Sequence, residues 1–325
     1  MFVKEMKKLT GLAEKFFLDY LDLSVQKFIS WQKDKNLSEK KIPNFHCATS
    51  EEVERVIEFK KKNMEIGYKR LTWMMVDGNV AYLSPSSVYR ILVKAALNNC
   101  WTKPAGEPKK QGFEQPLKAH EQWHTDISYL NFKGTFVYLI SVLDGYSRAI
   151  LSWDITTTME SLDVQLVLWK ACDSYLPSDF NPRVITDNGS QFLTSEFKQT
   201  LKDLSIAHSR TSVNHPQSNG KIERFHGTIK NESIRKIPKF TLQQFKEEVA
   251  TWIKFYNFER LHSSIQYIAP MDVINNKSNE IILARQTKLK DAKLRRREFW
   301  REQSNISEKP KEKNQMAFPT LVLNT

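Results

Sequence analysis

The hydrophobic positions in the middle of the chain follow the spacing of strands interrupted by helices. Three strand-like segments come first: WHTDISYL (123–130), TFVYLISVLD (135–144) and SRAILSWDI (147–155). The Asp144-Gly145 pair is a hairpin-type turn between the second and the third. The other expected elements are short strands over 183–186 and 205–211 and helices over 160–176, 194–204, 220–236 and 241–258. This order predicts an α/β fold, in which a mixed sheet carries helices on its faces.

Helical spacing dominates the N-terminal third of the chain. Residues 1–46 are lysine-rich and helical in pattern, with no recognisable chemistry. The cluster Thr49-Ser50-Glu51-Glu52 caps a first helix that Gly67 ends, and residues 68–76 form a second. Ser84-Pro85 begins a third, because serine suits the N-cap and proline the first helical position. Residues 47–102 are therefore expected to form a small all-α domain.

The third of these helices has two distinct faces. It buries Val88 and Leu92 and exposes Tyr89, Arg90 and Lys94. Three short helices, with a basic outer face on the last, are typical of a helix-turn-helix, whose exposed side chains would contact phosphates or base edges in a DNA major groove. The same spacing also fits a plain three-helix bundle with a solvated face.

Composition marks the remaining boundaries. Residues 103–118 contain three prolines and two glycines, as a linker does. Residues 279–303 form a basic helix candidate, and a polar tail follows. The expected organisation has five parts: a helical segment (1–46), a helix-turn-helix domain (47–102), a linker (103–118), an α/β core (119–275) and a basic helical extension with its tail (276–325).

Charge and cysteine content narrow the functional classes. The chain carries a net charge of +12, divided as +7 over residues 1–118, −1 over 119–275 and +6 over 276–325. Two basic flanks around a neutral core favour a polyanionic partner, although lysine-rich surfaces are also common in soluble proteins. Three scattered cysteines exclude a disulfide scaffold and a cysteine-based zinc finger. No apolar run approaches about 18 residues and no signal-peptide pattern opens the chain, so an intracellular protein without a membrane span is expected.

Three acidic residues occupy places where structure alone would not require them. Asp126 lies inside the first strand, Asp187 directly follows the buried strand VIT, and Glu223 falls in the first turns of a helix. A lone carboxylate beside a buried strand is costly unless it is paired or holds a metal ion. If the sheet brings the three together, they form an all-oxygen site of the kind that Mg²⁺ prefers. Two such ions roughly 3.5–4 Å apart would support in-line attack on phosphorus. Each acid taken alone also has a structural explanation, such as the turn at Asp187-Asn188-Gly189.

The spacing of two of these acids is more specific. Thirty-five residues separate Asp187 from Glu223. Lys230 follows Glu223 by two helical turns on the same face, beside the apolar residues Ile222, Phe225 and Ile229. A lysine in that position would hold a DNA phosphate near the metal ions, or simply lie at a solvated helix edge.

These segments resemble the catalytic core of retroviral-type integrases and of the insertion-sequence transposases that share the Asp-Asp-35-Glu signature. The resemblance is carried by five segments that span most of residues 120–275: 123–130, 143–148, 184–197, 214–232 and 256–272. Residues 50–100 also resemble the segment that precedes this core in one large bacterial insertion-sequence family. The resemblance implies a ribonuclease H-like fold and a DNA transposase.

The same resemblance assigns roles to individual residues. It makes Asp126, Asp187 and Glu223 the catalytic, metal-binding triad for Mg²⁺ or Mn²⁺, with two ions when DNA is bound. It implies that Lys230 and Asn219 contact DNA and places Asn188 beside the second acid. The loop 212–220 would be a mobile flap over the site. The implied partners are element ends and target DNA, bound by a homo-oligomer at the nucleoid, with no small-molecule substrate.

Two departures and two alternatives follow from the same residues. The cysteines cannot supply the zinc domain of retroviral integrases, and residues 1–46 are shorter than the N-terminal portion of many bacterial relatives. The chain could instead be a DNA-binding regulator derived from a transposase, or a hydrolytic nuclease of the same fold. The segment Tyr256 to His262 is expected to serve helix-end packing.

Overall fold

The computed structural model describes residues 2–21, 23–29, 47–98, 115–175, 181–211, 219–236 and 241–307. The chain forms two compact units, residues 1–50 with 290–325 and residues 51–289, each described by itself. Most of the expected linker, the flap over 212–218 and the tail beyond 307 lie outside the described residues. Among the described helices, none has the length and apolar character needed to cross a membrane.

The smaller unit begins with two short helices, α1 (Phe2–Thr10) and α2 (Glu14–Tyr20). Their apolar faces meet through Val3, Phe17 and Leu18, which are buried. In the same unit the indole Nε1 of Trp300 donates to the carbonyl of Cys47 at 3.0 Å. The helical pattern expected for the N-terminal segment is thus confirmed where the structure describes it.

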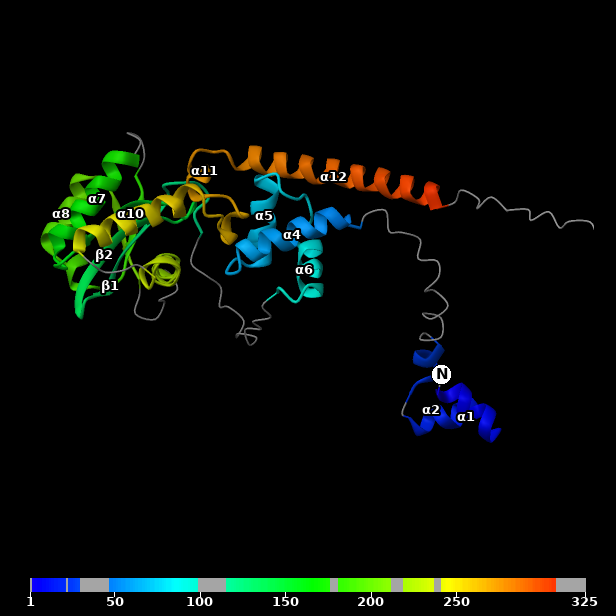
Figure 1. The fold of residues 1–325 in the computed structure, drawn as a ribbon. Helices are drawn as coiled ribbons and strands as arrows, with labels where there is room; N and C mark the ends of the chain where they lie inside the picture. The colour runs from blue at the N-terminus through cyan, green and yellow to red at the C-terminus, as the bar shows by residue number, and fades with distance from the viewer. Residues whose placement is uncertain are drawn as a thin grey trace, which may run out of the picture. The chain divides into compact units, whose positions relative to one another are not determined.

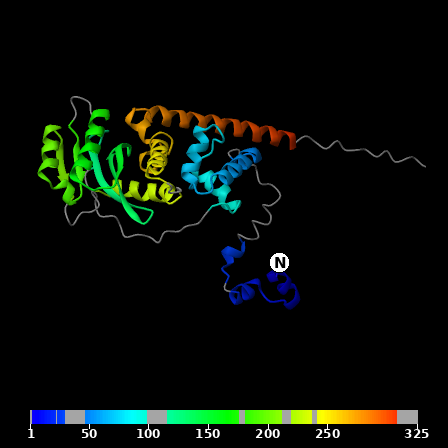
Figure 2. The same ribbon diagram turned by 60° about the vertical axis from the view of Figure 1, so that its left-hand side comes forward.

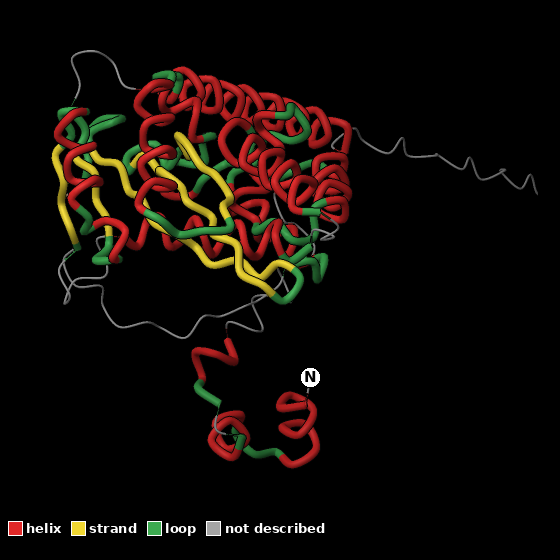
Figure 3. The backbone as a smooth tube through the Cα atoms, turned by 90° about the vertical axis from the view of Figure 1, so that its left-hand side faces the viewer, coloured by secondary structure: helices red, strands yellow, loops and turns green. Residues whose placement is uncertain are grey.

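The larger unit is built on a five-stranded mixed sheet. Its strands are β1 (Gln122–Phe132), β2 (Thr135–Asp144), β3 (Ile150–Thr156), β4 (Arg183–Thr186) and β5 (Ala207–Arg210). The spatial order is β3-β2-β1-β4-β5, with β1 antiparallel to β2 and parallel to β4. Figure 3 shows the strands in yellow with helices around them. All five strands expected from the sequence are present.

Helices cover both faces of this sheet, because side chains alternate along each strand. The helices are α7 (Ser161–Tyr175), α8 (Ser195–Asp203), α9 (Gly220–Ile229) and α10 (Leu242–Phe258). On one face Trp123 and Ile127 pack with α7 and α8. On the other, Leu130 and Leu139 pack with Ile222, Phe225 and Ile229 of α9 and with α10, as the apolar stripe of α9 predicted.

Three helices precede the sheet in the same unit: α4 (Ser50–Lys62), α5 (Tyr68–Asp77) and α6 (Pro85–Lys94). They are the blue and cyan helices in Figures 1 and 2. Their bounds match the expected helices, and the Ser84 hydroxyl accepts from the backbone N–H of Ser87 at 3.2 Å, as an N-cap should. Val88 and Leu92 are buried while Tyr89, Arg90 and Lys94 are exposed, as predicted.

The sequence did not predict the connection beyond α10. Residues 263–265 form a 3₁₀ turn, α11 (Pro270–Ile274) follows, and α12 (Ser278–Ser307) is the expected basic helix. Arg285 of α12 is buried and donates to both carboxylate oxygens of Asp77 at 2.8 and 2.6 Å. Its guanidinium also lies 4.9 Å from the Trp73 ring centroid. This contact fastens the first part of α12 to α5.

Candidate active site

Asp126 lies in the middle of β1, opposite Ser141 of β2, on the face covered by α9. Its Oδ1 accepts from the backbone N–H of Ile127 at 2.9 Å. Its Oδ2 lies 3.5 Å from Nδ1 of His226, a buried residue of α9 whose Nε2 is 2.9 Å from the Ser141 hydroxyl. Strand and helix together therefore fix this carboxylate, which stays partly exposed with 18% of its side-chain area accessible.

Asp187 follows the last residue of β4 directly, and β4 runs parallel to β1 as its neighbour. Its Oδ1 accepts from the backbone N–H of Gly189 at 2.9 Å, which closes the expected turn. Burial raises the pKa of Asp187, the Gly189 hydrogen bond lowers it, and the charge of Asp126 raises it further, for a net increase. The structure thus brings these two acids close enough for their charges to interact.

Glu223 lies in the first turn of α9 and is exposed. In the described ranges no three His, Cys, Asp or Glu side chains gather closely enough to hold a metal ion. The structure therefore brings Asp126 and Asp187 together but does not draw Glu223 into a three-acid cluster. Like charges that no cation neutralises repel one another, which opposes such gathering.

Lys230 directly follows α9 and is half-buried. Burial lowers its pKa, while the charge of Asp126 acts in the opposite direction. The ammonium group therefore lies within electrostatic range of the first acid. This placement fits a cation beside the acids and not a fully solvated helix edge.

The two asparagines are placed differently. Asn219 is buried at the start of α9, where its side chain lies close to His124. Asn188 donates to the carbonyl of Thr211 at 2.9 Å and so links the ends of β4 and β5. Contact of either with DNA stays a prediction, as does the role of Tyr89, Arg90 and Lys94 on α6.

A buried histidine and two half-buried cations lie near the start of α9, and the two cations, Lys221 and Arg148, were not predicted from the sequence. His124 is fully buried two residues before Asp126, and burial, with the charges of Lys221 and Arg148, lowers its pKa to about 3. Burial and the charge of Arg148 lower the pKa of Lys221 to about 8. The Lys221 ammonium donates to the carbonyl of Gly145 at 3.0 Å. A basic residue two places before Glu223 was the available signal.

The segment Tyr256 to His262 packs the end of α10, as expected. Asn257 bonds both the N–H and the C=O of Ile150, at 2.9 and 2.8 Å. Arg260 donates two hydrogen bonds of 2.7 Å to the carboxylate of Glu232. Arg70 of α5 approaches the same carboxylate to 3.7 Å. These contacts join β3, the segment that follows α9 and helix α5.

Two family models match the middle of this chain. The Integrase core domain family matches residues 116–216, and a second Integrase core domain model matches residues 204–270. Together the matches run from just before β1 to the start of α11. Asp126, Asp187, Glu223 and Lys230 all fall within them.

Curated relatives extend the comparison. The chain is 30% identical over 153 residues to the transposase for insertion sequence element IS904 of Lactococcus lactis, covering 46% of this chain and 59% of that protein. It is 28% identical over 226 residues to transposase InsD of an Escherichia coli insertion element, covering 65% of this chain and 74% of the other. The match thus spans less than two thirds of the Lactococcus protein.

Solved structures give a weaker likeness. The simian T-cell lymphotropic virus intasome is 17% identical with a TM-score of 0.45, over 67% of this chain and 73% of that chain. The HTLV-2 integrase catalytic core domain in complex with magnesium is 19% identical with a TM-score of 0.40, over 49% of this chain and 99% of the other. The five-stranded sheet described above has the mixed α/β arrangement expected from the sequence. Residues 116–270 thus match the Integrase core domain family, and over this region the chain is similar to insertion-sequence transposases.

Proposed function

We propose that this protein is a DNA transposase that cuts phosphodiester bonds at the ends of a mobile element and joins the resulting 3′-hydroxyls to target DNA. Asp126, Asp187 and Glu223 are the proposed ligands of divalent metal ions, Mg²⁺ or Mn²⁺. The match to the Integrase core domain family and the similarity to insertion-sequence transposases support the reaction class. The observation that carries the site is the proximity of Asp126 and Asp187, whose charges interact between the middle of β1 and the end of β4.

The donor set fits a hard divalent cation. Mg²⁺ commonly uses one or two protein carboxylates and takes its other ligands from phosphate and water, so Asp126 and Asp187 suffice to start a site. Glu223 is exposed and free to turn toward them once a cation offsets the repulsion. Bound metal ions would make an attacking oxygen more acidic and stabilise the leaving oxygen.

The protein's own residues supply positioning. His226 and the Ile127 N–H hold the Asp126 carboxylate on the face of α9. The Gly189 N–H orients Asp187 at the end of β4. Lys230 adds positive charge beside Asp126, where it would attract a DNA phosphate. Cutting and joining can share this site because water and a DNA hydroxyl attack the same kind of bond.

DNA binding beyond the site is proposed for two basic regions. Arg90 and Lys94 on α6, with Tyr89, would contact DNA as a helix-turn-helix does, and the basic residues of α12 would contribute phosphate contacts. A homo-oligomer is proposed because two element ends must be brought together. An exposed apolar stripe on α7, formed by Leu162, Leu166 and Trp169, is available for self-association.

The deciding experiment is Glu223→Gln, assayed on labelled duplexes that carry the DNA flanking the gene. We expect cleavage and strand transfer to fall together by about 10³-fold, because a neutral amide cannot replace a metal-binding carboxylate. Glu248→Gln is the matched control, since Glu248 is an exposed acid on α10. Retained strand transfer in Glu223→Gln would refute the assignment. Cleavage without joined products in the wild type would identify a nuclease, and DNA binding without cleavage a regulator.

A further inference from the structure

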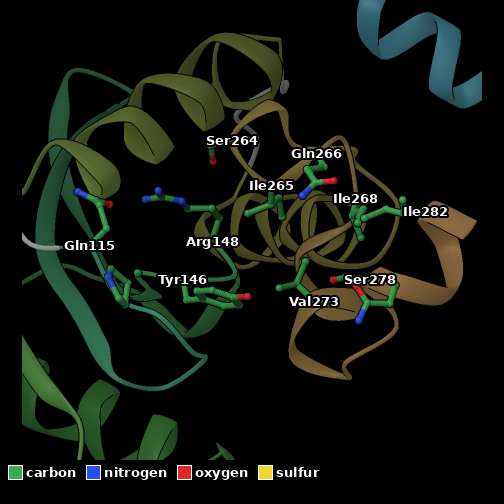
Figure 4. A pocket seen from close by; sticks show the side chains of 13 residues that line it. Gln115, Tyr146, Arg148, Ser264, Ile265, Gln266, Ile268, Val273, Ser278 and Ile282 are labelled. Atoms are coloured by element: carbon green, nitrogen blue, oxygen red, sulfur yellow. The ribbon is translucent and has the colours of Figure 1, made fainter. Parts of the chain in front are cut away.

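A cavity of about 380 Å³ lies beside the turn that joins β2 to β3. Its walls come from that turn, from the loop after α10 and from the start of α12, all within the larger unit. Figure 4 shows Tyr146 and Arg148 on one side and Gln266, Ile268 and Ile282 on the other. Among the described residues that line it, Arg148 is the only charged one; the polar groups include Ser264, Gln266 and Asn279.

The backbone of Arg148 is held firmly. Its φ of 69° is in the left-handed region, and its N–H donates to the carbonyl of Asp144 at 2.9 Å. Its own carbonyl accepts from the buried Tyr256 hydroxyl at 3.2 Å. A non-glycine residue in this conformation persists only where its surroundings enforce it. The turn therefore presents the Arg148 side chain from a fixed position.

Positive charge around Arg148 exceeds the negative charge that could neutralise it. Its buried Nε has no hydrogen-bond partner in the described part of the chain. Lys221 and Arg224 lie within electrostatic range, and the nearby acid is Asp144. The carboxylate of Asp144 is already engaged, because it accepts from the N–H of His120 and from both the N–H and the hydroxyl of Ser147.

We propose that this Arg148 cavity binds a backbone phosphate of the DNA substrate, an inference that rests on the proposed function. A guanidinium binds phosphate through two parallel hydrogen bonds, and the neutral polar groups of the cavity add further contacts. The volume exceeds that of a phosphate, and Ile265, Ile268 and Val273 offer an apolar wall for the attached sugar. A bound anion would offset the positive charge by which Arg148, Lys221 and Arg224 exceed the neighbouring Asp144.

Two residues beside the cavity wall lie close in the chain to the proposed metal-binding acids Asp126 and Glu223. Lys221, which bonds the Gly145 carbonyl at the cavity wall, is two residues before Glu223 on α9. His124, directly beside Gly145, is two residues before Asp126 on β1. Two strand residues span roughly 7 Å. A DNA strand whose phosphate lies in the cavity would therefore continue toward Asp126 and Glu223.

The test measures DNA affinity against salt concentration in EDTA, using fluorescence anisotropy with a labelled duplex. Each neutralised phosphate contributes about 0.9 to the slope of log K against log salt. We expect Arg148→Gln to reduce that slope by about 0.9 and to weaken binding about tenfold, while Arg148→Lys retains most of the slope. Lys202→Gln, which removes one exposed charge on α8 at the opposite face of the sheet, should leave the slope near its original value.

A second pair of variants tests the cavity without touching Arg148. Asn279 is exposed in the first turn of α12, where an acid is compatible with the helix. Asn279→Glu should reduce the slope by placing a carboxylate at the cavity, and Asn279→Gln should not. An unchanged slope in Arg148→Gln, or equal losses in Asn279→Glu and Asn279→Gln, would overturn the proposal. So would loss of self-association in Arg148→Gln, measured by sedimentation, without a change in slope, since that result assigns the cavity to a second copy.

The measurement separates this proposal from the proposed function, because EDTA removes any metal-dependent step. A protein whose salt slope depends on Arg148 but which never cuts DNA refutes the proposed function alone. A protein that cuts DNA with a slope independent of Arg148 refutes the cavity alone. A wild-type protein that binds no DNA in EDTA refutes the cavity proposal.

Discussion

Carboxylates at two places in the larger unit have opposite surroundings: Glu232 just after α9, and the pair Asp126 on β1 and Asp187 after β4. Glu232 has Arg260 at 2.7 Å and Arg70 at 3.7 Å. Asp126 and Asp187 have each other, and the nearest ring nitrogen to Asp126, on His226, is 3.5 Å away. The paired group neutralises its charge inside the protein. Asp126 and Asp187 concentrate negative charge, with the Lys230 ammonium as a cation within electrostatic range of Asp126. Such perturbed acids are common at functional sites.

The pKa values of Asp187 and Glu232 shift in opposite directions for the same reason. Burial acts to raise the pKa of both Asp187 and Glu232. For Glu232 the hydrogen bonds and charge of Arg260, with the charge of Arg70, reverse the effect and lower the pKa. For Asp187 the charge of Asp126 adds to the effect of burial, and the single Gly189 hydrogen bond does not reverse it. Neighbouring charge, more than burial, therefore distinguishes the ion-paired Glu232 from Asp187, which is proposed to bind a metal ion.

The largest expected effect is loss of catalysis in Asp187→Asn. Cleavage of element-end DNA should fall by about 10³-fold, because the amide removes a metal-binding charge while its oxygen can still accept from Gly189. Thermal stability, measured by circular dichroism, should stay equal or rise, since repulsion with Asp126 is removed. Asp203→Asn on α8 is the matched control. A large fall in melting temperature in Asp187→Asn would mean that this acid is structural.

Glu232→Gln is expected to lose stability and to keep its metal affinity, the reverse of Asp187→Asn. Removing the carboxylate leaves the nearly buried guanidinium of Arg260 without its ion pair, and the partial exposure of Glu232 reduces the loss. We expect a decrease of about 2 kcal/mol in the free energy of unfolding, measured in urea. Metal affinity, followed by Mn²⁺ titration calorimetry, should change little. The comparison fails if Glu232→Gln keeps its stability and loses Mn²⁺ binding instead.

The smallest effect is a difference in pH dependence between these two variants. The lowered pKa of Glu232 gives stability that is present above its unfolded pKa and lost as pH falls through the folded value. The raised pKa of Asp187 has the opposite sign, so its contribution is present below the unfolded pKa and lost as pH rises through the folded value. Metal-free unfolding curves from about pH 3 to 7 should show Glu232→Gln losing most, relative to wild type, at the upper end. Asp187→Asn should gain there, and parallel curves for the two variants would contradict the contrast.

Local sequence signals predicted much of the fold. The alternation in residues 123–130 and the apolar run in 135–144 located β1 and β2, because a strand with one or two buried faces requires those patterns. Ser84-Pro85 located the start of α6, because the cap needs a side-chain acceptor and proline tolerates the first turn. Helix α11 also begins with a proline, Pro270, but no side chain caps it and its five residues are too few to show a period.

The acids were predictable for a related reason. An acid inside a buried strand, such as Asp126, or directly after one, such as Asp187, stands out against its apolar neighbours. Their partners were not predictable in the same way. Nothing near Glu232 in the chain identifies Arg70 or Arg260 as its ion-pair partners, and nothing near Arg148 marks the surplus of charge around it.

The sequence by itself determined the order of elements, the polar residues within apolar segments and the interval between Asp187 and Glu223, because each depends on local periodicity and residue type. The tertiary structure decided which charges meet. It placed Asp187 beside Asp126, engaged Glu232 with two arginines and gathered Arg148, Lys221 and Arg224 near Asp144. Electrostatic energy depends on distance through space and on burial, and neither quantity is set by separation along the chain.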